Sequence, residues 1–191
     1  MTSTPQNMTL YDLPTSLNVG GVEYQIRSDF RAVIDILIAM NDPELDRNGK
    51  ATVILKILYP SWRDIPVERR QEALQKASEF IDCGQKDDGR KHPRMIDWEQ
   101  DAPLIIPAVN SVAHMEVRAI PDLHWWTFFG WFMEIGDSTF SNVLHIRGQQ
   151  AKGKNLDKAD REWYRQNRNL VDFKRTYTEV EKDILKQWGV E

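Results

Sequence analysis

The sequence is poor in the features that most directly define a protein's chemistry. It has a single cysteine, Cys83, which excludes an intramolecular disulfide framework and a zinc site built from cysteines. It has no run of eighteen apolar residues, so no transmembrane helix is expected. Residues 1–14 lack the basic region and the apolar core of a signal peptide. These absences favour a soluble, intracellular protein that has no membrane partner.

Catalytic motifs are absent as well. The four histidines include no i, i+4 pair with an intervening glutamate, and no Gly-Lys-Ser/Thr follows Gly20-Gly21 to form a phosphate-binding loop. A metal-dependent enzyme would need ligands that folding brings together, and the available set is His124, Glu134, Asp137 and His145. Because no spacing within this set is diagnostic, we predict no catalytic residues, no metal site and no cofactor.

Three carboxylates, Asp97, Glu99 and Asp101, crowd the start of one predicted helix. Paired carboxylates can perform acid–base chemistry, but acidic residues also favour a helix N-terminus through capping and the helix dipole. Residues 97–100 have the pattern of a capping box, so we interpret the cluster as structural. Cys83, beside Gly84 at a predicted helix C-terminus, is at the wrong helix end for a lowered thiol pKa and is interpreted as unreactive.

An excess of positive charge is also lacking. The net charge is −4 at pH 7, which removes the electrostatic signature of a general nucleic-acid binder. Ten basic and eight acidic side chains nevertheless occur in residues 151–191, where Arg161, Arg165 and Arg168 form a candidate stripe that could face a polyanion. We favour the alternative of a solvated helix face, on which Asp157 pairs with Arg161. Nucleic acid is therefore not an expected partner.

What the sequence has in abundance is material for a core. Hydrophobic residues make up 41% of the chain, which also contains seven tryptophans, seven phenylalanines and five tyrosines. Helical periodicity dominates after residue 27, and Val19-Gly20-Gly21-Val22 predicts a hairpin before it. We predict a mainly α-helical, bundle-like single domain with a small N-terminal β-hairpin. Its expected parts are a ribbon packed on the domain, a helical core and a charged helical extension, over residues 1–27, 28–150 and 151–191.

Individual helices follow from capping and breaking residues. Ser28 or Asp29 is expected to cap the first helix, and Asp137 a later one. Pro121-Asp122 is expected to cap the most buried helix, in which Gly130 would allow another element to approach closely. The remaining helices are expected over residues 51–58, 66–81, 97–112, 157–172 and 178–188, with an exposed loop over 85–94 and a bend or late start caused by Pro103 and Pro107.

The segment from His124 to Gly136 contains three tryptophans and three phenylalanines within nine residues. Such density usually indicates a core, because large aromatic side chains supply burial and packing energy. It exceeds what one helix normally requires, however. We therefore name Trp125, Trp126, Phe129 and Trp131 as candidate partner-binding residues, on the physics of amphipathic helices that bind one another.

The order of several motifs resembles a bacteriophage family often called the gene-product-fifteen family, encoded among the tail genes of long-tailed phages and prophages. The similarity extends from about Tyr24 to Gln150, with Asp97, Asp101, His124 and Arg147 as its structural signature. The matching residues are Asp29-Phe30-Arg31, Glu72-Ala73-Leu74, Phe80, Gly84, residues 96–102, residues 124–128, Phe140 and Arg147. Pro103 and Pro107 depart from the uninterrupted helix expected in this family.

The resemblance implies a non-enzymatic role in tail morphogenesis, in the cytoplasm of the bacterial host. Genes in this region commonly encode tail assembly chaperones, which hold the tape-measure protein soluble until tail-tube subunits polymerise around it. The implied partners are the tape-measure protein and, in addition, the major tail protein or a second copy of this chain. A structural virion component, such as a tail-completion or connector protein, is the alternative, and a metal-dependent enzyme comes third.

Overall fold

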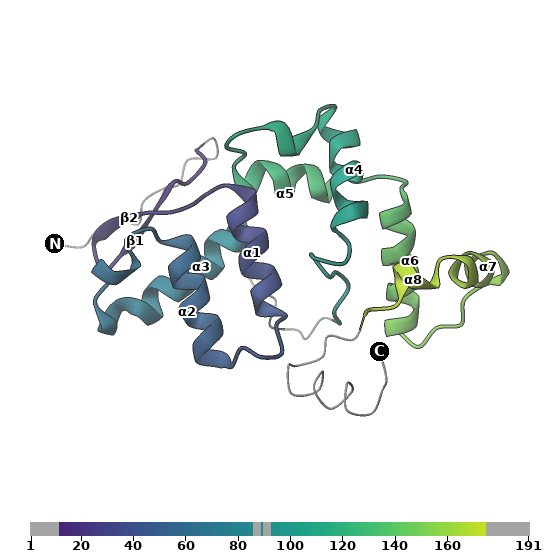
Figure 1. Cartoon of the computed structure of the whole chain (residues 1–191), viewed down its shortest axis with the longest axis horizontal. Helices are drawn as coiled ribbons and strands as arrows, with labels where there is room; N and C mark the ends of the chain where they lie inside the picture. The colour runs from purple at the N-terminus through teal and green to yellow at the C-terminus, as the bar shows by residue number, and fades with distance from the viewer. Residues whose placement is uncertain (1–11, 86–88, 90–92, 175–191) are drawn as a thin grey trace, which may run out of the picture.

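The computed structural model describes residues 12–85, 89 and 93–174, and in these residues the fold is mainly helical, as predicted. The molecule is elongated (Figure 1), with a hairpin and helices α1–α3 at one end, α4 and α5 in the middle, and α6–α8 at the other end. The helix expected over 178–188, and most of the loop expected over 85–94, lie outside the described residues.

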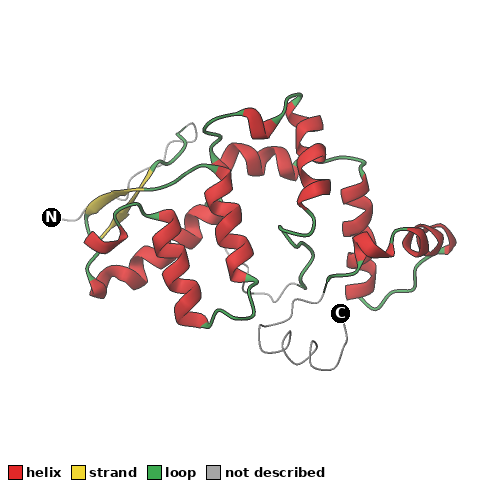
Figure 2. Ribbon diagram, in the orientation of Figure 1, coloured by secondary structure: helices red, strands yellow, loops and turns green. Residues whose placement is uncertain are grey.

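The predicted hairpin is present (Figure 2). Strands β1 (Ser16–Val19) and β2 (Val22–Gln25) pair antiparallel, with Val19 opposite Val22. Gly20 and Gly21 both have positive φ values, of 60° and 86°, which glycine adopts without a steric penalty. The Gly20 N–H donates to Glu72 Oε1 at 2.9 Å, in helix α3 (Arg70–Ile81). This bond lowers the pKa of Glu72 and ties a ribbon that would be marginal by itself to a helix.

The first two helices begin where side chains can accept their unpaired N–H groups, whereas no side-chain hydrogen bond caps the start of α3. Asp29 caps α1 (Phe30–Met40), as predicted, by accepting from Arg31 N. Helix α2 (Arg47–Leu58) starts four residues earlier than expected, because the Asp46 carboxylate accepts from Gly49 N at 2.6 Å. Two 3₁₀ turns, Trp62–Asp64 and Val67–Arg69, delay the start of α3.

The caps of the central helices differ from the predicted ones. Helix α5 (Trp125–Met133) is capped by His124 and not by Pro121-Asp122. Helix α6 (Thr139–Ala151) is capped by Ser138 and not by Asp137, because Ser138 and Ser141 form a reciprocal capping box. Helix α4 (Ala102–Ala113) starts late, with Pro103 in its first turn and Pro107 inside it.

Gly130 in α5 does not play the role predicted for it. Its backbone is exposed, and a Cβ atom added there would meet nothing within 4 Å. No other element makes the predicted close approach. The sequence alone could not show this, because all of α5 except one threonine and one glycine is apolar, and the exposed side is set by which neighbours pack against it.

The helix expected over 157–172 is broken into α7 (Lys158–Gln166) and α8 (Arg168–Val171) at Asn167. The break lets Val171 turn toward α6, where it forms a small buried cluster with Val143 and Ile146. The larger core cluster is formed mainly by α1–α5 and Phe140 of α6. Within the residues described, no helix is long and apolar enough to cross a membrane.

Two glycine substitutions should have opposite effects on stability. Gly130→Ala should raise the free energy of unfolding by about 0.5–1 kcal/mol, because alanine has the higher helix propensity and the site is open. Gly20→Ala should lower it by about 1–2 kcal/mol, because φ is +60° and the new Cβ would lie 2.9 Å from Arg69 Nε. Urea unfolding monitored by circular dichroism measures both, and equal signs would contradict the placement of these glycines.

Candidate functional site

Two signature motifs that lie far apart in the sequence meet in the fold. Phe30 N donates to Leu123 O at 2.9 Å, and Trp125 N donates to Ser28 O at 2.7 Å. The Asp29 carboxylate accepts from Leu123 N at 2.9 Å while it also caps α1. The motifs beginning at Asp29 and His124 therefore act as one unit, which joins the starts of α1 and α5.

His124 is a structural residue at this junction. Its Nδ1 accepts from Trp126 N at 3.0 Å, and its Nε2 lies 2.9 Å from Pro14 O. Since Nδ1 is an acceptor and a carbonyl can only accept, this geometry requires the neutral tautomer with its proton on Nε2. Both ring nitrogens are bound by backbone atoms, and His124 is the N-cap of α5.

The second signature contact is a buried ion pair between Asp101 and Arg147. The side chains are 1% and 3% exposed, and the two guanidinium–carboxylate bonds measure 2.6 and 3.0 Å. Arg147 also donates to the carbonyl oxygens of Met95, Leu170 and Val171. All five N–H donors of the guanidinium are thereby used, and the Phe173 ring lies 4.1 Å from its central carbon. No donor of Arg147 remains for a ligand, so the pair holds the fold.

The capping box expected at residues 97–100 is only partly formed. Asp97 Oδ1 accepts from Glu99 N and Gln100 N, and Asp97 N donates to Asp101 Oδ2. These bonds close a turn that precedes α4, whereas the helix itself begins at Ala102. Because Pro103 at the start of α4 has no N–H, the capped turn does not continue as a regular helix.

The four aromatic residues proposed to bind a partner are mostly engaged within the molecule. Trp125 is 1% exposed, so it belongs to the core and not to the surface. Its Nε1 donates to Ile81 O, and Trp126 Nε1 donates to Phe80 O, both at 2.8 Å. The two indoles thus satisfy carbonyls at the C-terminus of α3. Phe129 and Trp131 are partly buried against the same core.

The three arginines of the candidate stripe are exposed but do not form one continuous face. Arg161 and Arg165 lie in α7, whereas Arg168 lies beyond the break, in α8. Arg165 pairs with Glu162 and Arg168 with Asp172, each guanidinium being neutralised locally. Arg161 Nε donates to the backbone carbonyl of Asp157 and not to its carboxylate, which corrects the predicted ion pair. This arrangement fits a solvated helix face.

The candidate metal ligands are not brought together. His145 Nε2 lies 3.0 Å from Asp160 Oδ2, while His124 is bound by backbone atoms at another junction. Over residues 12–85, 89 and 93–174, no group of three or more His, Cys, Asp or Glu side chains is placed to hold a metal ion.

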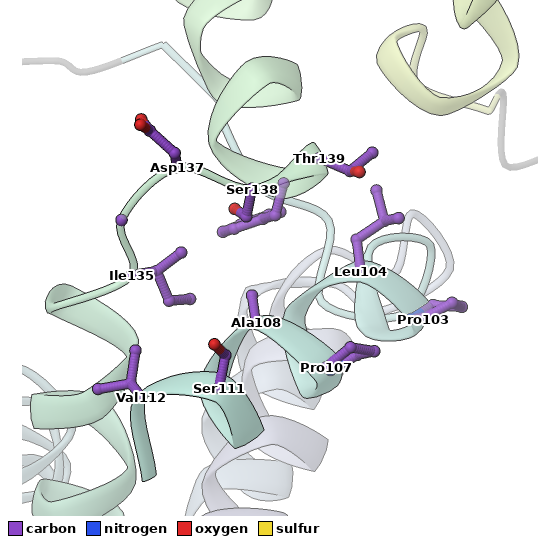
Figure 3. Close-up of a pocket in the computed structure, with 12 residues that line it drawn as sticks. Pro103, Leu104, Pro107, Ala108, Ser111, Val112, Ile135, Asp137, Ser138 and Thr139 are labelled. Atoms are coloured by element: carbon purple, nitrogen blue, oxygen red, sulfur yellow. The ribbon is translucent and has the colours of Figure 1, made fainter. Parts of the chain in front are cut away.

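A groove lined by both apolar and polar residues, which the sequence patterns did not indicate, lies between α4 and the connection from α5 to α6 (Figure 3). It has a volume of about 470 Å³. Ile135 and Ala108 face each other across it, and Ser111 lies on its α4 side. Its lining is Pro103, Leu104, Pro107, Ala108, Ser111, Val112 and residues 135–140. Since Pro107 has no N–H, the carbonyl of Pro103 has lost its intrahelical donor beside the groove. The sequence feature that marks this region is the pair of prolines in one helix, which does not by itself predict a groove.

The residues that carried the sequence resemblance are therefore the ones that join the helices. The described chain is mostly helical, and its sequence matches a family of bacteriophage proteins. The chain is a member of the Bacteriophage Gp15 protein family, whose family model matches residues 10–173. No curated protein sequence and no solved structure matches the chain significantly.

Removal of one partner of the buried ion pair should be costly. Asp101→Asn should lower the free energy of unfolding by about 3–5 kcal/mol, because it leaves the Arg147 charge buried without a counter-ion. Glu162→Gln, which breaks the exposed pair with Arg165, should change it by less than about 1 kcal/mol. Urea unfolding measures both values. Similar effects of the two substitutions would contradict the structural role assigned to Asp101.

Cys83 should react slowly in the native protein. Burial, with a smaller contribution from the Asp82 charge, raises the pKa of its thiol from 9.0 to about 12. The thiolate fraction at pH 8 is then roughly 1,000-fold smaller than for an unperturbed cysteine. Alkylation by iodoacetamide should accelerate at least 100-fold when urea unfolds the chain at that pH. Equal native and unfolded rates would show that the thiol is not shielded.

Proposed function

We propose that this chain is a tail assembly chaperone, a non-enzymatic phage morphogenesis protein that binds the tape-measure protein in the host cytoplasm. Two observations support the proposal. The chain belongs to a bacteriophage family, and its surface carries a partly apolar groove beside a helix that contains two prolines. The groove is the observation that carries the proposal, because it supplies a surface that can accept apolar side chains from another protein.

The chemistry of the groove suits an amphipathic helical segment. Leu104, Val112 and Ile135 contribute apolar side chains to the groove. Its polar side chains are those of Ser111, Asp137, Ser138 and Thr139. Such a site can take side chains from one face of a helix and leave the opposite face in water.

The size of the groove also suits reversible binding. A cavity of about 470 Å³ holds only a few side chains, so each contact contributes a modest affinity. A tape-measure protein is long, and several chaperone copies could bind successive segments of it. The coat would then be stable as a whole through multivalency, yet polymerising tail-tube subunits could displace the copies one at a time.

In this proposal the main surface that binds the partner is the groove and not the aromatic segment of α5. Trp125 is excluded as a contact because it is buried. Trp126, Phe129 and Trp131 support the surrounding core, and only their exposed portions are available to extend a contact surface. The major tail protein and a second copy of this chain remain proposed additional partners.

Co-expression with a fragment of the tape-measure protein tests the proposal. The wild-type chain should keep the fragment soluble and co-purify with it. Ser111→Arg should reduce the co-purified fragment at least tenfold, because it places a long charged side chain into the groove from an exposed position. Ala159→Arg makes the same change in charge on the exposed surface of α7, away from the groove, and should have no effect.

Two results would contradict the proposal. One is failure of the wild-type chain to solubilise or bind any part of the tape-measure protein. The other is a stoichiometric number of copies in purified virions, which would favour the alternative of a structural tail-completion or connector protein. Equal binding by Ser111→Arg and Ala159→Arg would leave the chaperone role intact and reject only the groove as its site.

A further inference from the structure

Three positively charged side chains surround a single indole ring at the hairpin end of the molecule. Trp62 lies in the 3₁₀ turn between α2 and α3, and its ring is partly buried against the core. Lys56 Nζ lies 5.5 Å from the ring centroid, and the guanidinium carbons of Arg63 and Arg70 each lie 5.4 Å from it. We call Lys56, Trp62, Arg63 and Arg70 the Trp62 cluster.

The positive charge of the Trp62 cluster is not neutralised. Within the part of the chain that the structure describes, none of its three cations forms an ion pair. This contrasts with Arg165 and Arg168, each of which has a carboxylate partner. Like charges gathered around one ring repel one another, and a cation–π contact offsets this repulsion only in part.

Arg70 is placed unfavourably in two further respects. It is the first residue of α3, where the positive end of the helix dipole disfavours a cation, and no side chain caps this helix start. Its Nε is also shielded from solvent and has no hydrogen-bond partner among the described residues. An unpaired buried donor is costly, so Arg70 gains little from its present surroundings. An incoming anion would relieve the repulsion among the three cations.

We propose that the Trp62 cluster binds an acidic segment of a partner protein through the carboxylates of that segment. Guanidinium groups match carboxylates in a bidentate geometry, and Arg63, Arg70 and Lys56 come from three different elements that present them around one rigid ring. This inference does not depend on the groove, which lies between α4 and the start of α6, in another part of the molecule (Figure 1).

A nucleic acid fits the cluster less well. Binding of single strands normally uses an aromatic face on which a base can stack, whereas cations already lie over the ring of Trp62. An acidic peptide segment needs only the cations, so charge complementarity favours it.

Calorimetric titration of the whole chain with a synthetic peptide of four Glu-Glu-Ala repeats tests the inference. The wild-type chain should bind the peptide, and an increase from about 50 to about 300 mM salt should weaken the affinity, since salt screens exposed charges. The double variant Arg63→Gln/Arg70→Gln should bind at least tenfold more weakly. The matched control Arg161→Gln/Arg165→Gln removes the same charge from α7 and should bind as the wild type does.

Further measurements keep the outcome decisive. Arg63→Gln alone changes an exposed residue, so it should retain the wild-type circular dichroism spectrum and bind several-fold more weakly. No binding by the wild type would overturn the proposal. Equal weakening in both double variants would also overturn it, because the effect would then reflect net charge alone. Tighter binding of an oligothymidylate than of the peptide, lost in the Arg63/Arg70 variant, would instead assign the cluster to nucleic acid.

Discussion

The burial of one positive charge constrains the rest of this structure. Arg147 of α6 lies in the interior, and it is tolerated there only because Asp101 and three backbone carbonyls occupy all of its donors. Those partners come from the start of α4, the segment that precedes it, and α8. One side chain therefore requires four stretches of the chain to be in place at once. It also explains why the helix after residue 157 must break, since α8 has to turn its last carbonyls toward the guanidinium.

A second polar junction holds α1 and α5 together, as Arg147 holds α4 and α6 together. Asp29 and His124 each cap their own helix, and the two chain segments that contain them exchange backbone hydrogen bonds. These polar junctions lie around a core rich in aromatic side chains, which supplies burial but little orientation. The groove is a consequence of both, because α4 is positioned by Asp101 and the α5–α6 connection follows directly from α5. Asp29, Asp101, His124 and Arg147 are thus positioning residues, and none of them lies in the groove or in the Trp62 cluster.

Much of the architecture could be predicted from local patterns. The hairpin follows from two glycines between β-forming residues, and the first helix from the cap at Asp29. Capping predictions failed where several acceptors compete. Ser138 and not Asp137 caps α6, because Ser141 completes a reciprocal pair of hydrogen bonds with it. His124 and not Asp122 caps α5, and its second ring nitrogen is held by Pro14 O. The groove could not be predicted, since its walls come from segments whose relative placement depends on long-range contacts.

The sequence by itself determined the class of the fold, the helical periodicity, the absence of recognisable catalytic motifs and the family resemblance, since these depend on residue type and spacing along the chain. The tertiary structure alone decided which polar residues are buried together and which aromatic residues remain available. Trp125 and Trp126 are adjacent in sequence, yet the former is buried in the core and the latter keeps an exposed portion. No sequence pattern marks Trp62, but folding places around it three cations that form no ion pair with any described residue. Side-chain environment is a property of neighbours distant in sequence, and only packing brings those neighbours together.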